Sequence, residues 1–111
     1  MPLIHVRTSK DIDPKEDLLL ILSQSLAKLT GKPESYVMII LDTNALISFG
    51  ASLEPSAFVE VKSIGSLYPK ELSKEICSIL ENNLDIPPNR IYINFEDINA
   101  SNWGYNSSTF G

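Results

Sequence analysis

The stretch PLIHVRT at residues 2–8 occurs again, in altered form, as AFVEVKS at residues 57–63. A shift of 55 residues aligns the two stretches without a gap and places apolar residues on apolar residues at four positions. The same shift continues downstream and brings the total to eight identities. Chance similarity explains an apolar pattern, but one shift that also aligns the start and exit of a helix favours a true repeat. The sequence therefore predicts two strand–helix–strand units, at about residues 2–41 and 57–96.

Each unit carries the signals of a helix start. Asp13 is a good N-cap, Pro14 suits the first helical position, and Glu16 completes a start similar to a capping box. Pro69 and Glu71 repeat this pattern in the second unit. The residues that follow are apolar at helical spacing, namely Leu18, Leu22, Leu26 and Leu29 in the first unit and Leu72, Ile76, Ile79, Leu80 and Leu84 in the second. Each unit is therefore expected to contain one helix that packs on a sheet through a single face.

The closing strands of the two units differ in pattern. Residues 36–41 are apolar without alternation, which indicates a strand buried on both faces. Residues 91–96 alternate and place Tyr92 and Asn94 together on one face, with apolar residues on the other. If both helices pack on one side of the sheet, its other face must be buried against other subunits, which predicts a small closed oligomer.

These patterns predict an α/β fold of the α+β type in one domain over residues 1–111. Two βαβ repeats form a mixed four-stranded sheet with two helices on one face. The C-terminal segment, residues 97–111, is rich in Asn and Ser but contains Trp103, Tyr105 and Phe110. Because aromatic residues are unusual in solvated tails, we expect ordered loops or short strands there.

Composition and charge disfavour nucleic acid and membranes as partners. Of the 111 residues, 43% are hydrophobic and 21% charged, as in an ordinary soluble globular protein. The net charge of −5 disfavours nucleic acid and anionic membranes, since both attract clustered Lys and Arg. No apolar run is long enough to cross a bilayer, and the first residues do not resemble a signal peptide. A cytoplasmic protein is therefore expected.

The reactive side chains do not form a familiar metal or nucleophile site. Cys77 is the single cysteine, so it has no internal disulfide partner, and its place in an amphipathic pattern indicates a buried structural thiol. His5 is the single histidine, and the spacing suggests no Ser or Cys partner for it. No two-histidine or multi-cysteine pattern is present. We expect neither a metal nor a cofactor.

Topology brings three segments to one edge of the predicted sheet. A right-handed crossover makes the two strands of a unit parallel, so Pro2 and Lys32 lie near the same edge. If the second unit runs antiparallel to the first, the turn that contains Ile64 reaches that edge as well. By the same geometry Tyr92 and Asn94 lie away from Pro2 of their own chain. They join such a site only from a neighbouring subunit.

Five parts of the chain carry a family resemblance. Pro2, GKPESY at residues 31–36, SIG at 63–65, YINFEDINA at 92–100 and GYNSSTF at 104–110 resemble the macrophage migration inhibitory factor family of the tautomerase superfamily. The resemblance covers nearly the whole chain and implies a homotrimer with three sites at subunit interfaces. It also implies that the amino-terminal proline is a catalytic base and that the substrates are enolisable 2-oxo acids such as phenylpyruvate, together with D-dopachrome.

The resemblance assigns further roles to this chain. Lys32 and the backbone N–H of Ile64 would hold the substrate's carboxylate or carbonyl end, and Asn94 of the adjacent subunit would face a phenolic hydroxyl. The remaining substrate-binding residues would form an apolar and aromatic rim, with Tyr36, Trp103, Tyr105 and Phe110 from one chain and Tyr92 from the neighbour. Without the resemblance, Lys32 is read as a solvated cation, Tyr36 as core, and Tyr92 with Asn94 as interface residues.

Proline suits this chemistry only as a free amine. Removal of Met1 exposes the secondary amine of Pro2, whereas an attached Met1 makes that nitrogen an amide without proton affinity. Keto–enol conversion needs a base whose pKa is near the working pH. An ordinary α-amino group titrates at about 7.7 to 8.0, and an apolar pocket or a nearby cation such as Lys32 lowers its pKa.

The chain also departs from the cytokine that gives the family its name. Residues 56–59 lack its Cys-x-x-Cys pair, so thiol–disulfide oxidoreductase activity is not expected. Lys62 replaces a histidine, and Trp103 and Tyr105 replace valine and tryptophan, which leaves the substrate preference open. A cytokine-like protein-binding trimer with a weak or vestigial pocket is the alternative function, and a purely structural trimer is a third.

Overall fold

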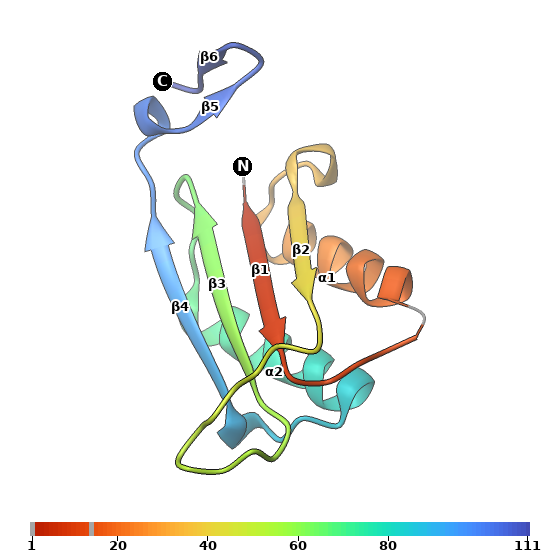
Figure 1. Ribbon diagram of the computed structural model, residues 1–111. Coiled ribbons are helices and arrows are strands. Elements are labelled where there is room, and N and C mark those ends of the chain that lie inside the picture. Colours follow the sequence, from red (N-terminus) through yellow and green to blue (C-terminus); the bar gives the residue numbers. More distant parts are fainter. Residues whose placement is uncertain (1, 14) are drawn as a thin grey trace.

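The computed structural model describes residues 2–13 and 15–111 and contains a mixed four-stranded sheet in the order β2-β1-β3-β4. β1 pairs parallel with β2 and antiparallel with β3, which pairs parallel with β4. Both helices cover the same face of this sheet (Figure 1). The main elements are β1 (Leu3–Thr8), α1 (Lys15–Thr30), β2 (Met38–Asp42), β3 (Ala57–Ser63), α2 (Pro69–Leu84) and β4 (Ile91–Asp97). The predicted fold class is confirmed.

Short elements complete the chain. The 3₁₀ turns η1 (Glu34–Tyr36) and η2 (Pro88–Arg90) precede β2 and β4. After β4, η3 (Ala100–Asn102) leads into a two-stranded hairpin of β5 (Gly104–Tyr105) and β6 (Ser108–Thr109). This hairpin lies beyond the end of the sheet where β1 begins (Figure 1).

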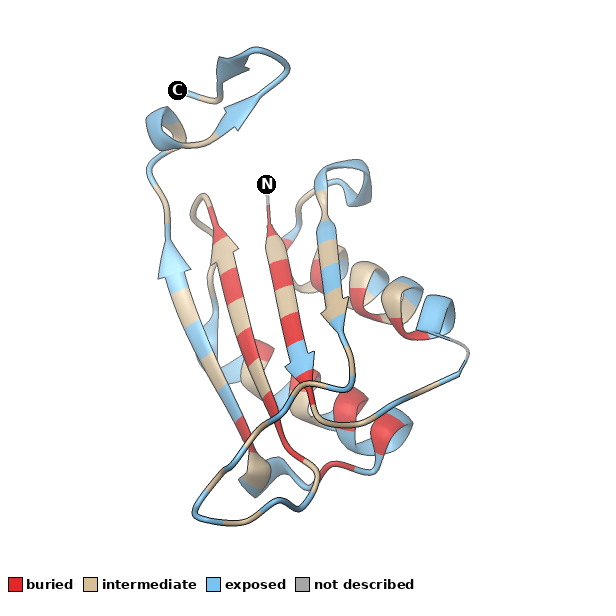
Figure 2. Cartoon of the chain, viewed as in Figure 1, coloured by how far each residue is buried: buried red, intermediate tan, exposed pale blue. Residues whose placement is uncertain are grey.

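The core lies between the helices and one face of the sheet. Burial alternates along β1 and β3, as Figure 2 shows, with Ile4, Val6, Val59 and Val61 at most 1% exposed. Burying one such side chain contributes about 1.5–3 kcal/mol. The helices meet them with buried residues at helical spacing, which are Leu18, Leu22 and Leu26 of α1 and Leu72, Ile76 and Leu80 of α2. The period-two pattern of the strands therefore explains which face holds the helices.

The repeat is present, but the gapless shift of 55 residues is wrong by one residue beyond the first strand. Ile4 of β1 pairs with Ile39 of β2, and Val59 of β3 pairs with Ile93 of β4. Val59 follows Ile4 by 55 residues, but Ile93 follows Ile39 by only 54. The buried helix positions Leu18, Leu22, Leu26 and Thr30 likewise correspond to Leu72, Ile76, Leu80 and Leu84 at a shift of 54. The connection from strand to helix is one residue shorter in the second unit, and burial rather than identity marks equivalent positions.

The helix boundaries follow simple backbone rules. Pro69 occupies the start of α2, as its missing N–H allows. Asp85 ends α2 in the left-handed region with φ 56°, and Gly31 follows α1 with φ 70°. Pro14 lies outside the described residues, so its place at the start of α1 stays a prediction. Within residues 2–13 and 15–111, no helix is long and apolar enough to cross a membrane.

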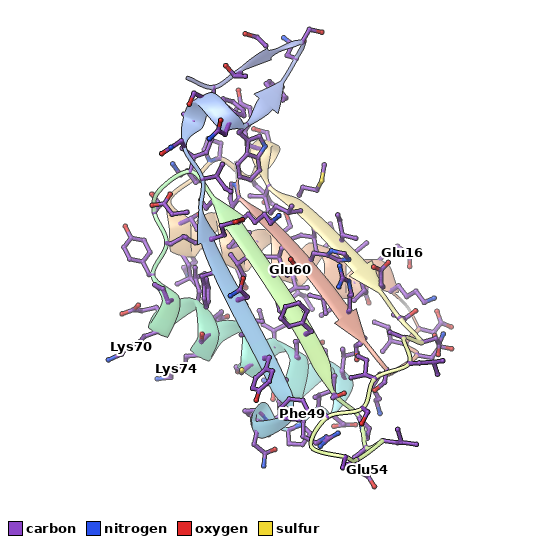
Figure 3. The ribbon with its side chains drawn as sticks, turned by 60° about the vertical axis from the view of Figure 1, so that its left-hand side comes forward. Glu16, Phe49, Glu54, Glu60, Lys70 and Lys74 are labelled. Atoms are coloured by element: carbon purple, nitrogen blue, oxygen red, sulfur yellow. The ribbon has the colours of Figure 1, made fainter. Side chains whose placement is uncertain are left out.

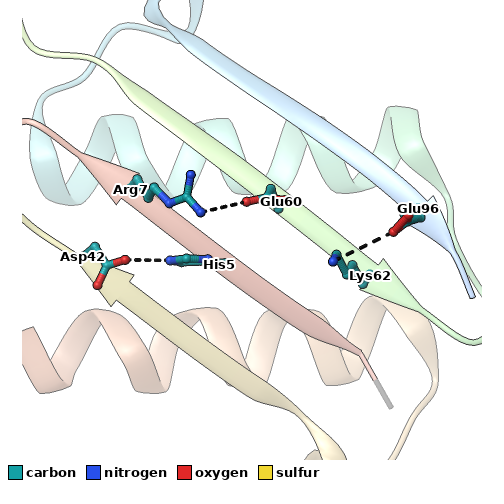
Figure 4. A network of polar contacts seen from close by, with 6 residues as sticks. All are labelled: His5, Arg7, Asp42, Glu60, Lys62 and Glu96. Atoms are coloured by element: carbon teal, nitrogen blue, oxygen red, sulfur yellow. Dashed lines mark hydrogen bonds and ion pairs between the residues drawn. The ribbon is translucent and has the colours of Figure 1, made fainter. Parts of the chain in front are cut away.

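The face of the sheet opposite the helices is only partly covered within one chain, and we call it the open face. The sequence predicts that β2 is buried on both sides, but Met38 is 60% and Ile40 37% exposed there. The two helices already occupy the other face, so cover for Met38 and Ile40 would have to come from another chain. Three cross-strand polar pairs also lie on the open face, as Figure 4 shows, namely His5–Asp42, Arg7–Glu60 and Lys62–Glu96.

Candidate active site

A cavity of about 570 Å³ lies where β1 begins. Pro2 and Leu3 line it, together with the segment from η1 into β2 and the C-terminal hairpin. Most of the lining is apolar or aromatic, as in many small-molecule sites. The complete lining is Pro2, Leu3, Ser35, Tyr36, Val37, Met38, Lys62, Ile98, Asn102, Trp103, Gly104, Tyr105 and Phe110.

Pro2 is fixed by the sheet. Its side chain is less than 2% exposed, and its carbonyl oxygen accepts a hydrogen bond from the Met38 N–H at 3.0 Å. This bond extends the pairing of β1 with β2 by one residue. On the other side, Leu3, the next residue, is paired with Lys62 of β3. The proline is thus held at the cavity wall by its bond to Met38 and by the pairing of the residue that follows it.

The hairpin supplies most of the aromatic wall. The rings of Tyr105 and Phe110 stack with centroids 5.2 Å apart and an interplanar angle of 10°. The ring of Tyr36 meets both edge-on, at 5.5 Å from Tyr105 and 5.9 Å from Phe110. Such pairs contribute about 0.5–1.5 kcal/mol each beyond their buried area. The structure therefore brings four predicted rim residues, these three and Trp103, into one cavity with Pro2.

The hairpin turn explains how the wall is positioned. Asn106 and Ser107 both have positive φ, 52° and 64°, between the paired residues Tyr105 and Ser108. Two central residues of positive φ give the backbone twist that two-residue hairpins favour. The Phe110 N–H then donates to the Trp103 carbonyl oxygen at 3.1 Å and returns the last aromatic ring to the cavity.

The turn that contains Ile64 is braced by the end of β4. The Ser63 hydroxyl donates to the Gly65 carbonyl oxygen at 2.8 Å, and the Gly65 N–H donates to Asp97 Oδ1 at 3.0 Å. The Ile98 N–H donates to the Ser63 carbonyl oxygen at 2.8 Å. These bonds place Ile98 in the cavity wall, whereas Ile64 itself is half-buried and outside the lining.

Three other predicted site residues do not line this cavity. Lys32 is half-buried after α1, where its N–H donates to the Thr30 hydroxyl oxygen at 3.3 Å. Asn94 is exposed on β4. Tyr92 is 66% exposed, and its ring centroid lies 4.6 Å from that of Phe49, beside a separate hollow of about 350 Å³.

The register explains the position of Tyr92. It pairs with Phe58, which pairs with Arg7, five residues along β1 from Pro2. At about 3.3 Å per residue this is roughly 17 Å. The geometric prediction that Tyr92 lies away from Pro2 of its own chain is therefore confirmed.

The sequence did not single out Lys62 as a site residue. It contributes the one charged side chain of the cavity lining, counted over the residues that the structure describes. The signal was present in the strand pattern, because Lys62 alternates onto the open face directly opposite Leu3. The family comparison indicated only that Lys62 replaces a histidine, and it gave no position for the side chain.

Comparison with known proteins gives one consistent result. Residues 1–111 match the family model described as macrophage migration inhibitory factor. The factor of Xenopus laevis is 43% identical over 114 residues, which cover 99% of each chain. Among solved structures, the homologue from Prochlorococcus marinus is 46% identical with a TM-score of 0.95, covering 98% of this chain and 99% of that one. The factor from Trichinella spiralis is 33% identical with a TM-score of 0.92, covering 97% of this chain and 99% of that one.

Proposed function

The chain belongs to the macrophage migration inhibitory factor family, and we propose that it is a keto–enol tautomerase of phenylpyruvate-like 2-oxo acids, with D-dopachrome as a further candidate substrate. Pro2 acts as general base once Met1 has been removed. One observation carries the proposal: Pro2 is fixed and buried at the wall of an apolar, aromatic cavity large enough for a phenyl ring and a three-carbon acid.

The reaction moves one proton within the substrate. In ketonisation, the free amine of Pro2 accepts the proton of the enol hydroxyl, and the resulting ammonium returns a proton to C3 as the C2–O bond becomes a carbonyl. The reverse reaction takes the proton from C3 and returns it to the oxygen. Atoms and charge balance without a co-reactant, and the base is regenerated in each cycle.

Burial adjusts the base for this task. A buried ammonium loses hydration, so in this proposal an apolar wall favours the neutral Pro2 amine over its charged form. A lower pKa raises the fraction of free base at neutral pH. The aromatic rings of Tyr36, Tyr105 and Phe110 then offer a surface for the phenyl ring of the substrate.

The complete site requires a homotrimer in this proposal. Tyr92 and Asn94 lie too far from Pro2 of their own chain and would come from a neighbouring copy, while Lys32 and the backbone N–H of Ile64 would hold the carboxylate or carbonyl end of the substrate. Apolar side chains that need cover support this assembly, since Leu46 is 103% and Leu53 84% exposed in the single chain.

The test is the Pro2→Gly variant, with the amino terminus of both proteins verified by intact-mass measurement. Loss of a general base predicts a fall in kcat/KM for phenylpyruvate of about 100-fold or more. Pro87→Gly, at an exposed site beside η2, is the matched control and should keep its activity. Unchanged turnover by Pro2→Gly with an unaltered oligomer would refute the role of Pro2.

The names of the relatives support a second candidate, a cytokine-like trimer whose pocket is vestigial. It predicts negligible turnover by the wild-type protein even when Pro2 is verified as the amino terminus. Saturable binding to a protein partner would then favour this candidate over the tautomerase.

A further inference from the structure

We propose that Lys62 is the specificity-determining cation of the cavity and selects substrates that carry a carboxylate. This inference rests on the proposed tautomerase function and deepens it by naming the group that recognises the acid. It adds Lys62 to Lys32, the cation that the family resemblance places at the same end of the substrate.

Position is the first support. Lys62 lies on β3, directly opposite Leu3, the residue that follows Pro2. Lys62 and Pro2 line the same cavity from neighbouring strands, so a substrate bound there can meet both groups.

The surroundings of the cavity give the second support. Among the described residues of the lining, Lys62 has the single charged side chain, and the other polar groups are neutral hydroxyls and amides such as Ser35 and Asn102. Lys62 is therefore the one group of the described lining that offers a substrate carboxylate an opposite charge, whereas Lys32 does not line the cavity within the single chain.

The third support is that Lys62 is only loosely held. Its ammonium lies 3.9 Å from Glu96 Oε2, which is too long for a hydrogen bond. The other two pairs on the open face are shorter, at 2.7 Å for His5–Asp42 and 3.3 Å for Arg7–Glu60 (Figure 4). The side chains of Lys62 and Glu96 are 41% and 53% exposed, so their attraction is weak. A substrate carboxylate can replace Glu96 at little cost.

The test compares an acid with its neutral ester in four variants. With phenylpyruvate, Lys62→Met should raise KM about tenfold at nearly constant kcat, because one charge-assisted hydrogen bond is lost. With methyl phenylpyruvate the KM should not change, and Lys62→Arg should keep most of the affinity for the acid. Glu96→Gln should lower the KM for the acid about twofold, because the competing anion is gone.

Lys70→Met is the matched control for the loss of one positive charge. Figure 3 shows Lys70 on α2, which packs on the face of the sheet away from Glu60, and the residue is exposed. This variant should leave both substrates unaffected. If Lys62→Met impaired acid and ester equally, or lowered only kcat, Lys62 would have a structural role and the inference would fail. No effect on either substrate would also overturn it.

A binding measurement separates this inference from the proposed function. Calorimetric titration with 3-phenylpropanoate and 3-phenylpropanamide requires no turnover. We expect the wild-type protein to prefer the carboxylate and Lys62→Met to lose that preference, even if the protein proves not to be a tautomerase. Equal affinity of the wild-type protein for the acid and the amide would overturn the role of Lys62 while leaving Pro2 untested by this result.

Discussion

The two ends of the sheet are built in different ways. At the end where β1 begins, aromatic rings and Pro2 surround a cavity. At the other end, the Arg90 guanidinium group donates to four backbone carbonyls of one loop, and its Cζ lies 5.2 Å from the centre of the Phe49 ring. The loop with Phe49 and Glu54 lies below this end of the sheet in Figure 3.

One small domain thus has hydrogen-bonded, rigid contacts at one end of its sheet and an apolar binding surface at the other. A planar guanidinium group presents several fixed donors, so the Arg90 side chain alone can bond four carbonyls of an irregular loop that no strand covers. The cavity end leaves apolar surface uncovered, which a ligand or a neighbouring subunit can bury. Stability and binding should therefore respond separately to substitutions at the two ends.

The largest effect on stability is expected from Arg90→Ala. It removes four hydrogen bonds to carbonyls at 2.9–3.3 Å. At about 0.5–1.5 kcal/mol for each net hydrogen bond, and with part of the loop exposed to water, the free energy of unfolding should fall by about 2–3 kcal/mol. Chemical denaturation followed by circular dichroism measures this change.

The same variant tests whether the two ends are independent. Trp103 is the single tryptophan of the sequence and lines the cavity, so its emission reports on that end alone. The native emission maximum should not move in Arg90→Ala. Arg7→Ala removes one exposed pair with Glu60 and is the control, with an expected cost of about 0–1 kcal/mol. A shifted Trp103 emission in Arg90→Ala would show that the ends are coupled.

Phe110→Leu should have a small effect on stability and a clear effect on the cavity, the reverse of what is expected for Arg90→Ala. It keeps an apolar side chain but removes the ring that stacks on Tyr105 and meets Tyr36. The loss of two aromatic contacts should cost about 1 kcal/mol, while the emission of Trp103 shifts and the KM for phenylpyruvate rises. An unchanged emission maximum with a large loss of stability would contradict the proposed division between the ends.

Sequence patterns were sufficient for the fold because each pattern has a single physical reading. Alternation along residues 91–96 indicated two different faces of β4, and apolar spacing in the helices indicated the stripe that packs on the sheet. The error of one residue in the repeat arose because the shift was chosen by counting identical residues, whereas burial marks the equivalent positions. Thr30 and Leu84 occupy equivalent buried positions without being alike.

The candidate site was predicted less completely. Topology indicated that the turn with Ile64 reaches the edge at Pro2, but it did not show which side chains line the cavity, because a lining depends on rotamers and on the C-terminal hairpin. The strand pattern placed Lys62 on the open face opposite Leu3, but not in the cavity lining. Outside the site, the role of Arg90 was also missed, for a different reason. The four carbonyls bound by Arg90 belong to an irregular loop that has no periodic pattern.

A smaller effect is expected at the hairpin that carries the aromatic wall. Ser107 has φ 64°, a conformation that costs an L-residue about 1 kcal/mol and glycine much less. Ser107→Gly should therefore stabilise the hairpin by roughly 0.5–1 kcal/mol and leave the KM unchanged. Amide hydrogen exchange of Phe110, whose N–H bonds to Trp103, should slow by about threefold. Faster exchange would mean that the turn does not hold the wall in place.

The smallest effect concerns Cys77 on α2, in the helix layer that both ends share. Burial is the main cause that raises the pKa of its thiol, and the nearby Glu81 carboxylate adds to it. The folded protein therefore holds the neutral thiol at pH values where an unfolded chain forms the thiolate, so this group makes folding less favourable as the pH rises above the ordinary thiol pKa. Alkylation by iodoacetamide should have its pH midpoint above that of free cysteine, and Glu81→Gln should lower the midpoint slightly.

If Arg90→Ala accelerates alkylation of Cys77 at pH 8 more than Phe110→Leu does, the arginine end controls the opening of the helix layer. Equal acceleration by the two variants would mean that the layer opens only with the whole domain.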